Sequence, residues 1–160
     1  MKNIFVIGSS TLDLFFQDPS LTLKRDRFTL AVGGKYVVDT FYEGVGGGGA
    51  NVAVGLSRKG FTWVLWAEIG RDSLTKLIRE RLENEGVDCS LLEHKERHIN
   101  FSSILLSPSG ERTIINHRSH EAQMLLTDEI REKVRQSHLL YLGNMPEMPI
   151  TERVELVKLV

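Results

Sequence analysis

Four consecutive glycines at residues 46–49 stand directly before a stretch with helical character, in the segment EGVGGGGANVAVGLSRKG. A run without Cβ atoms lets the backbone adopt unusual conformations and lets a ligand lie directly on its N–H groups. The start of a helix adds unpaired N–H donors and the positive end of the helix dipole. Such a run is suited to hold hydroxyl groups or an anion. The alternative is a flexible linker, which is a common use of glycine-rich segments.

Three polar side chains are candidates for contacting the same ligand. Asn51 follows the glycines and offers a donor and an acceptor, with helix capping as its structural alternative. Asp13 comes after the first apolar run, where open parallel sheets place their ligand crevices, and its carboxylate can accept hydrogen bonds from two sugar hydroxyls. Asn144 follows a later strand, with Gly143 clearing space beside it. Ordinary turns are the alternative explanation for Asp13 and Asn144.

Other kinds of site find no support in the sequence. It contains no G-x-x-x-x-G-K-[ST] phosphate loop, and GSSTLD after the first apolar run lacks the G-x-G-x-x-G dinucleotide pattern. His94, His98, His117 and His120 lie among charged residues, without carboxylate or thiol partners at ligand spacing. We therefore expect neither a P-loop nor a metal site.

The composition favours a globular protein with a small molecule or another protein as partner. Charged residues make up 26% of the 160 residues, the net charge is -1, and there is no long run of one sign. This balance argues against nucleic acid or a membrane surface as partner. The only cysteine, Cys89, cannot form an internal disulfide, and no targeting or membrane-spanning segment is visible. We expect a cytoplasmic protein.

The spacing of apolar residues predicts alternating strands and helices. Strands are expected at residues 4–7, 61–70, 87–94 and 138–143. Helices are expected at residues 50–59, after Asp72 or Ser73, from Thr127 or Asp128 to Gln136, and from Thr151. This order predicts an α/β fold with a parallel sheet flanked by helices.

Two β-rich segments interrupt this pattern. FTLAV and KYVVDTFY predict a hairpin around Gly33 and Gly34, and INFSSILL and ERTIINHR predict a second hairpin around the SPSG turn at 107–110. The two hairpins could pair with each other. In the first, Val38 and Tyr42 would point to one face while Val37 and Phe41 would point to the other. A small sheet that is apolar on both faces would cover a ligand beneath and a partner subunit outside.

The segment GGGGANVAVGLSRKG, followed by WAEIGRD, resembles the first signature of the PfkB/ribokinase family of carbohydrate kinases. FVIGSSTLD resembles the first strand of that family, which ends in an aspartate, and residues 28–42 and 99–118 resemble its lid strands. The resemblance implies a ribokinase-like fold that is incomplete. Residues 1–160 would be the N-terminal part of a single domain, with a small β-sheet lid approximately within 14–45 and 98–118.

The resemblance also implies roles for individual residues. Asp13 would bind sugar hydroxyls, Gly47 and Gly48 would offer their backbone to the sugar and act as the lid hinge, Asn51 would hold another hydroxyl, and Asn144 would lie near the substrate. Two positions depart from ribokinases, which usually have a lysine in place of Gly48 and often an acidic residue in place of Asn144. The resemblance therefore does not specify ribose as the sugar.

The second signature of the family, a G-A-G-D motif that supplies the catalytic base, is not found in these 160 residues. The resemblance implies the sugar-binding N-terminal portion of an ATP-dependent carbohydrate kinase, without a catalytic residue of its own and inactive alone. ATP and Mg²⁺ would serve the intact enzyme and would not bind fully to this chain. The last helix lacks a C-terminal stop signal, which suggests an arbitrary cut with exposed apolar surface.

Two further hypotheses stay open. The chain could be a non-catalytic module that binds a sugar, polyol or nucleoside, or a piece that dimerises, with a homodimer formed through the β lid. A nucleotide-dependent oxidoreductase domain with an unusual loop is the third class.

Overall fold

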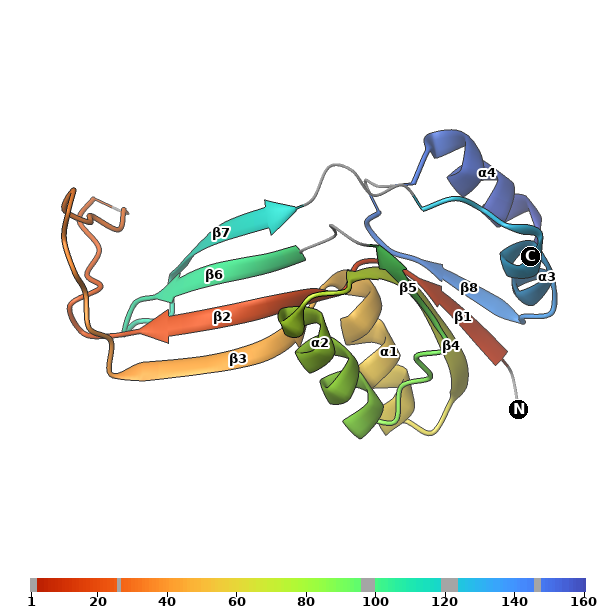
Figure 1. Ribbon diagram of the computed structural model, residues 1–160, viewed down its shortest axis with the longest axis horizontal. Coiled ribbons are helices and arrows are strands. Elements are labelled where there is room, and N and C mark those ends of the chain that lie inside the picture. The colour runs from red at the N-terminus through yellow and green to blue at the C-terminus, as the bar shows by residue number, and fades with distance from the viewer. Residues whose placement is uncertain (1–2, 26, 96–99, 119–123, 146–147) are drawn as a thin grey trace.

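The computed structural model of the chain describes residues 3–25, 27–95, 100–118, 124–145 and 148–160. The first of its sheets is parallel throughout and has the strand order β5-β4-β1-β8. Its strands are β1 (Asn3–Ile7), β4 (Thr62–Gly70), β5 (Leu91–Lys95) and β8 (Leu139–Leu142). Helices α1 (Gly48–Arg58) and α2 (Ser73–Asn84) cover one face, and α3 (Asp128–Arg135) and α4 (Ile150–Lys158) cover the other (Figure 1). The predicted α/β fold is confirmed.

Strand β1 shows why this sheet needs helices on both faces. Ile4 and Val6 belong to the apolar cluster under α1 and α2, whereas Phe5 and Ile7 belong to the cluster under α3 and α4. Each fully buried side chain of this size contributes about 1.5–3 kcal/mol. Burial on both faces therefore fixes the strand, as a continuous apolar run predicts.

Two helices begin at residues that satisfy their free N–H groups. The Asp72 carboxylate accepts hydrogen bonds from the Leu74 amide at 2.8 Å and from the Thr75 hydroxyl at 2.9 Å. Burial by itself would raise the pKa of Asp72, but these hydrogen bonds outweigh it and hold that pKa below its ordinary value. The Thr127 hydroxyl accepts from the Ile130 amide at 3.3 Å. Of the alternatives that the sequence left open, Asp72 and Thr127 are the caps.

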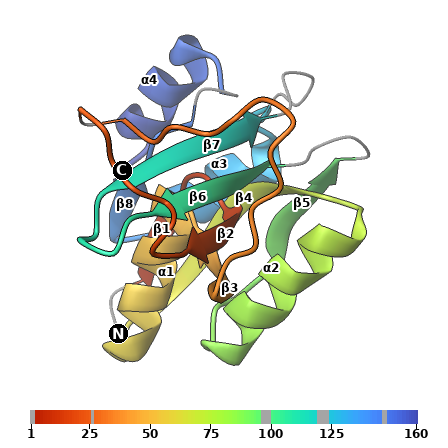
Figure 2. The same ribbon diagram turned by 90° about the vertical axis from the view of Figure 1, so that its left-hand side faces the viewer.

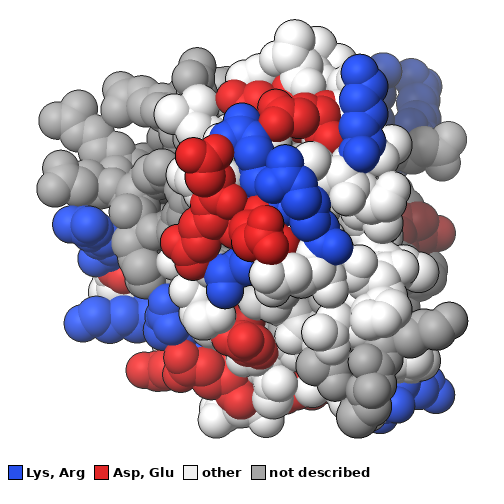
Figure 3. Space-filling model, turned by 90° about the vertical axis from the view of Figure 1, so that its right-hand side faces the viewer, with Lys and Arg blue, Asp and Glu red and all other residues white. Residues whose placement is uncertain are grey.

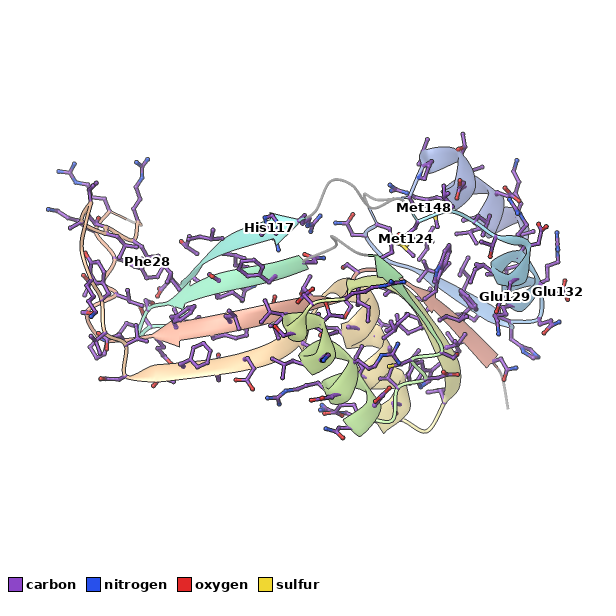
Figure 4. The ribbon with its side chains drawn as sticks, viewed as in Figure 1. Phe28, His117, Met124, Glu129, Glu132 and Met148 are labelled. Atoms are coloured by element: carbon purple, nitrogen blue, oxygen red, sulfur yellow. The ribbon has the colours of Figure 1, made fainter. Side chains whose placement is uncertain are left out.

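Helices α3 and α4 are joined at their outer surface by charged side chains. Arg131 of α3 donates to Glu155 of α4 at 2.6 Å and to Asp128 at 2.9 Å. Figure 3 shows acidic and basic side chains lying next to one another on this face of the molecule. Beneath them the apolar cluster includes Met124 and Met148, which Figure 4 shows beside the two helices.

A second sheet projects away from this body (Figures 1 and 2). Its strand order is β3-β2-β6-β7, and the strands are β2 (Thr11–Gln17), β3 (Thr40–Gly46), β6 (Asn100–Leu106) and β7 (Arg112–Arg118). Strands β2 and β6 pair in parallel, and the two outer pairs are antiparallel. The predicted hairpin around the SPSG turn is confirmed, because β6 and β7 flank it. We call this element the projecting sheet.

The predicted hairpin around Gly33 and Gly34 is wrong. Residues 28–39 contain no strand, and β3 begins at Thr40 and pairs with β2 instead. Gly33 has a φ of +74° in a turn that the Gly34 amide closes onto the Ala31 carbonyl at 3.0 Å. Val32 and Val37 are exposed. Because β-branched residues favour strands mainly where their side chains pack against neighbours, these residues do not form a strand here.

Asp18 joins the two ends of the segment between β2 and β3, residues 18–39. Its side chain is buried, and its carboxylate accepts hydrogen bonds from the Ser20 amide at 2.7 Å and from the Asp39 amide at 3.1 Å. Hydrogen bonds from Ser20 hold the pKa of Asp18 below its ordinary value. Residues 18 and 39 are therefore neighbours although 20 residues lie between them.

The projecting sheet is apolar on both faces towards its free end. Phe15 stacks on Tyr42 with ring centroids 4.5 Å apart, and on the other face Phe16 lies against Phe41 at 5.3 Å. The expected opposite orientation of Tyr42 and Phe41 is thus observed. Val37 and Val38 precede β3, so their expected place in the sheet is wrong.

Candidate functional site

Three glycines meet at the carboxyl end of the parallel sheet, where β1, α1 and the segment after β8 converge. A Cβ atom on Gly49 would lie 2.7 Å from the carbonyl carbon of Gly8, and one on Gly8 would lie 3.5 Å from the Cα of Gly143. Real Cβ atoms almost never approach a backbone atom as closely as 2.7 Å. The close backbone packing brings the glycine run beside the end of β8.

The fold also requires glycine at two more positions of the run, Gly46 and Gly47. A Cβ atom on Gly46 would overlap with the Asp13 carboxylate. Gly47 has a φ of +93°, and a Cβ atom there would lie 2.5 Å from the Ser9 carbonyl oxygen. The run lies between strands of the two sheets: Gly46 ends β3, Gly47 is the N-cap of α1, and Gly48 and Gly49 are in α1. The linker interpretation is therefore wrong.

Ser9 accepts hydrogen bonds from the first N–H groups of α1. Its carbonyl accepts hydrogen bonds from the Gly49 amide at 3.1 Å and the Ala50 amide at 3.2 Å, and its hydroxyl accepts from the Gly48 amide at 3.3 Å. The expectation that these donors are unpaired is wrong. Sequence reasoning missed Ser9, and the signal available was its place directly after Gly8 at the end of β1.

Gly48 is the member of the run with open space around it. A Cβ atom there would have one neighbour within 4 Å, the Tyr141 hydroxyl at 3.8 Å. Tyr141 lies on β8, and its ring packs against the cluster under α1 and α2. Its hydroxyl therefore bounds the space above Gly48. The sequence signal for Tyr141 was a polar-tipped residue in an otherwise apolar strand.

Asp13 lies in the third position of β2 and not in a loop after β1, which corrects its expected location. The side chain is half-buried, and one carboxylate oxygen accepts a hydrogen bond from the Thr11 hydroxyl at 3.1 Å. Across the projecting sheet it is in register with Gly44 and Ser102, so it shares their face. The pairing of β2 with β3 sets this carboxylate against Gly46 at the start of the glycine run. A carboxylate beside bare backbone is suited to hold a ligand with several hydroxyls.

Asn51 and Asn144 are exposed side chains at the same end of the parallel sheet. Asn51 lies in the first turn of α1, whose N-cap is Gly47, so the capping explanation for Asn51 is wrong. Asn144 follows Gly143, whose amide donates to the Ile7 carbonyl at 2.8 Å. The structure thus sets Asp13 against Gly46 of the run, while Asn51 donates its amide to Gly47 and Asn144 follows Gly143, which packs on Gly8.

The described residues contain no group of three or more His, Cys, Asp or Glu side chains that could hold a metal ion. Of the histidines considered above, His117 stands on β7 and lies against Phe101 with ring centroids 5.7 Å apart (Figure 4). The side chain of His94, and residues 98 and 120, lie outside what the structure describes. Burial raises the pKa of Cys89 to about 11, which keeps its thiol protonated. None of the helices in the described part of the chain has the length and apolarity to cross a membrane.

Comparison with known proteins gives consistent matches. The family model described as pfkB family carbohydrate kinase matches residues 1–156. A 2-dehydro-3-deoxygluconokinase of Bacillus subtilis (strain 168) is 34% identical over 98 residues, which cover 59% of this chain and 30% of that protein.

Solved structures match the fold over nearly the whole chain. The ribokinase of Arabidopsis thaliana, complexed with ribose and ATP, has a TM-score of 0.80 at 21% identity. The ribokinase of Thermotoga maritima has a TM-score of 0.76 at 23% identity. In both comparisons the match covers 99% of this chain and 50% of the other. The chain therefore spans about half the length of these ribokinases, and their likeness shows the fold.

Proposed function

The chain belongs to the pfkB family of carbohydrate kinases, and from this premise we propose that it is the N-terminal, sugar-binding part of an enzyme that transfers a phosphoryl group from ATP to a sugar hydroxyl. The observation that carries the proposal is the contact between the Asp13 carboxylate and the glycine run at the carboxyl end of the parallel sheet. Ligands of open α/β sheets bind at this end.

The proposed contacts with the sugar come from five residues. Asp13 accepts hydrogen bonds from sugar hydroxyls, each contributing about 1.5–3 kcal/mol because the acceptor is charged. Gly47 and Gly48 let the sugar ring approach the backbone, and the open space at Gly48 supports this. Asn51 and Asn144 are exposed at the same end and supply further polar contacts.

The projecting sheet is the proposed lid over the sugar. The face that carries Asp13 also carries Phe15 and Tyr42, so a ligand at Asp13 would meet apolar side chains further along the sheet. An ion pair between Glu43 of β3 and Arg81 of α2 links the sheet to the body. Gly47 and Gly48, between the end of β3 at Gly46 and the body of α1, are the proposed hinge. Closing such a lid excludes water from the reacting groups.

The proposed single domain continues beyond these residues, and the part outside them carries the catalytic base, ATP and Mg²⁺. Within the described residues, β8 is paired on one side only, with β1. Ile150, Val154 and Val157 are exposed apolar side chains at i, i+4 and i+7 of α4, and Leu139 of β8 is exposed too. A sheet edge and a helix face of this kind are suited to pack against further strands and helices.

Thermal unfolding with added ligands tests this function. We expect a sugar or sugar acid to raise the melting temperature, by about 5–10 °C at 100 times its Kd. The panel includes ribose, fructose, 2-dehydro-3-deoxygluconate, 5-dehydro-2-deoxygluconate and adenosine. We expect no shift with ATP and no phosphorylated product with ATP and Mg²⁺. A shift with ATP or NAD, and none with any sugar or nucleoside, would contradict the proposal. A sugar shift together with a longer reading frame that encodes no G-A-G-D motif would favour a non-catalytic binding module.

A homodimer through the projecting sheet is the proposed assembly. On the face opposite Asp13, Phe41 is 54% exposed and Ile115 is 60% exposed. We expect Phe41→Glu to convert a dimer into a monomer in sedimentation velocity, because a charge would be buried between the sheets. Val32→Glu is the matched control, since Val32 is fully exposed outside the sheet. A monomeric parent chain, or an unchanged dimer in Phe41→Glu, would rule out this interface.

The proposed compartment is the cytoplasm. The buried thiol of Cys89, the chain's only cysteine, supports a reducing environment. Recovery of the protein in a secreted fraction would contradict this assignment.

A further inference from the structure

Polar side chains cross the projecting sheet on the face that carries Asp13. Asp13 of β2 is in register with Ser102 of β6, and Ser102 is in register with Asn116 of β7. The Asn116 side-chain amide donates a hydrogen bond to the Ser102 hydroxyl at 3.1 Å, so both side chains lie on this face. His117, the next residue of β7, lies against Phe101 on the opposite face, as strand alternation requires (Figure 4). Asp13, Ser102 and Asn116 therefore form one polar row across three strands.

Arg118 adds a positive charge to this row. It stands two residues after Asn116 on β7 and so shares its face. The Arg118 Nε atom donates to the Asn116 Oδ1 atom at 3.0 Å. Asn116 thus contacts Ser102 through the nitrogen of its side-chain amide and Arg118 through the oxygen. The exposed Arg118 guanidinium is therefore held on the Asp13 face by its neighbour.

Asp13 and Arg118 have opposite charges, and both have hydrogen-bonding capacity left for a ligand. Among the residues that the structure describes, the Arg118 side chain donates only to Asn116, which uses one of its five N–H groups. Neither Asp13 nor Arg118 forms an ion pair within the same residues. Adjacent strands lie about 4.8 Å apart, so β2 and β7 are about 10 Å apart with β6 between them. A ligand lying across β6 can therefore contact both side chains.

The two groups recognise different chemistry. The Asp13 carboxylate accepts hydrogen bonds, which suits the hydroxyls of a sugar. The Arg118 guanidinium only donates, and its planar fork matches the two oxygens of a carboxylate. A neutral sugar would leave this charge without an anionic partner.

We propose that the ligand bound at Asp13 is a sugar acid whose carboxylate pairs with Arg118. Asn116 is a positioning residue, because it orients the guanidinium without itself contacting the carboxylate. This inference rests on the proposed sugar-binding function and names the class of substrate.

Isothermal titration with a matched pair of ligands tests the pairing. The acid is 2-dehydro-3-deoxygluconate, and its neutral counterpart is 3-deoxyfructose, which has a CH₂OH group in place of the carboxylate. We expect the acid to bind about 10–100-fold more tightly, because hydrogen bonds between charged groups are the stronger ones. Arg118→Ala should remove this difference and leave the Kd of 3-deoxyfructose unchanged. Arg118→Lys should restore part of it, because lysine keeps the charge but not the fork.

Two further variants separate the charge of Arg118 from its position. Arg112→Ala is the matched control, since Arg112 is exposed on the same strand and face but about 20 Å away along β7. It should leave both Kd values unchanged. Asn116→Ala should reduce the preference for the acid without weakening binding of 3-deoxyfructose. A purely structural role of Asn116 would weaken both ligands alike.

The outcomes distinguish this inference from the proposed function. Equal Kd values for the two ligands, or an Arg118→Ala variant that weakens both equally, would overturn the pairing and leave sugar binding at Asp13 in place. Binding of fructose 6-phosphate that depends on Arg118, without binding of the acid, would overturn the carboxylate in favour of a phosphate. Binding of no sugar and no sugar acid would overturn the proposed function together with this inference.

Discussion

Replacing Gly49 with alanine is expected to lower the free energy of unfolding by about 3 kcal/mol, and the melting temperature by about 6–12 °C. The added methyl group would lie 2.7 Å from the Gly8 carbonyl carbon and 2.8 Å from the Gly8 Cα atom. Both are backbone atoms of the segment that leaves β1, so no side chain can rotate away. Helix α1 must then move off the parallel sheet. Circular dichroism during heating or urea titration measures the loss.

Gly55 offers the matched control in the same helix. A Cβ atom on Gly55 would have nothing within 4 Å, and the residue is exposed. Gly55→Ala should therefore raise stability by about 0.5–1 kcal/mol, because glycine is a poor helix residue. If Gly49→Ala unfolds at the same temperature as the parent chain, the close packing of α1 on Gly8 is not what stabilises this part of the fold.

Replacing Asp13 with asparagine is expected to weaken sugar binding by about 100-fold while leaving the fold intact. Asparagine has nearly the same shape and can still accept the hydrogen bond from the Thr11 hydroxyl. What it lacks is the charge, and hydrogen bonds to a charged acceptor are worth about 1.5–3 kcal/mol each, where 1.4 kcal/mol is a tenfold change in affinity. Isothermal titration with the sugar found by thermal shift gives the two Kd values.

Asp39→Asn is the control for the change in net charge. Asp39 is exposed and is tied to Asp18 through its backbone amide, so loss of its carboxylate should leave the Kd unchanged. In the intact enzyme, Asp13→Asn should reduce kcat/KM for the sugar with little effect on ATP binding. An Asp13→Asn chain that binds the sugar as tightly as its parent would remove Asp13 from the site.

The parallel sheet and its helices were predictable because their signals are local. Residues 4–7 form an apolar run that a strand buried on both faces requires, and Asp72 and Thr127 are residue types that satisfy helix N–H groups. These signals depend on neighbours within a few positions. In these elements, the tertiary packing agrees with the secondary structure that the local sequence favours.

The projecting sheet was only partly predictable, because β propensity does not specify a partner. Residues 28–39 are rich in residues that favour strands, but they do not pair as a strand. β3 instead pairs with β2, some 30 residues earlier in the chain. Asp13 was expected in a crevice loop because it follows the first apolar run, at the end of a strand expected in a parallel sheet. In the structure, the strand continues through Asp13 and buries Leu12 instead.

The glycine run was predictable as a candidate site, and its internal contacts were not. The hydrogen bonds from Gly48, Gly49 and Ala50 to Ser9 join residues about 40 positions apart. The same is true of the Tyr141 hydroxyl, which is more than 90 positions from Gly48. Such contacts follow from how α1 docks on the sheet, which the spacing of residues within either segment does not specify.

Because of the Asp18 carboxylate, the segment between β2 and β3 can change in length without altering the pairing of the two strands. One side chain holds both ends, through the amides of Ser20 and Asp39, whatever the length or composition of the chain between them. The entropy of closing a flexible loop grows slowly, by about 0.6 kcal/mol for each doubling of its length. Insertions and deletions within residues 21–38 therefore carry a small thermodynamic penalty. We therefore expect this stretch to accept changes in length while β2 and β3 keep their register.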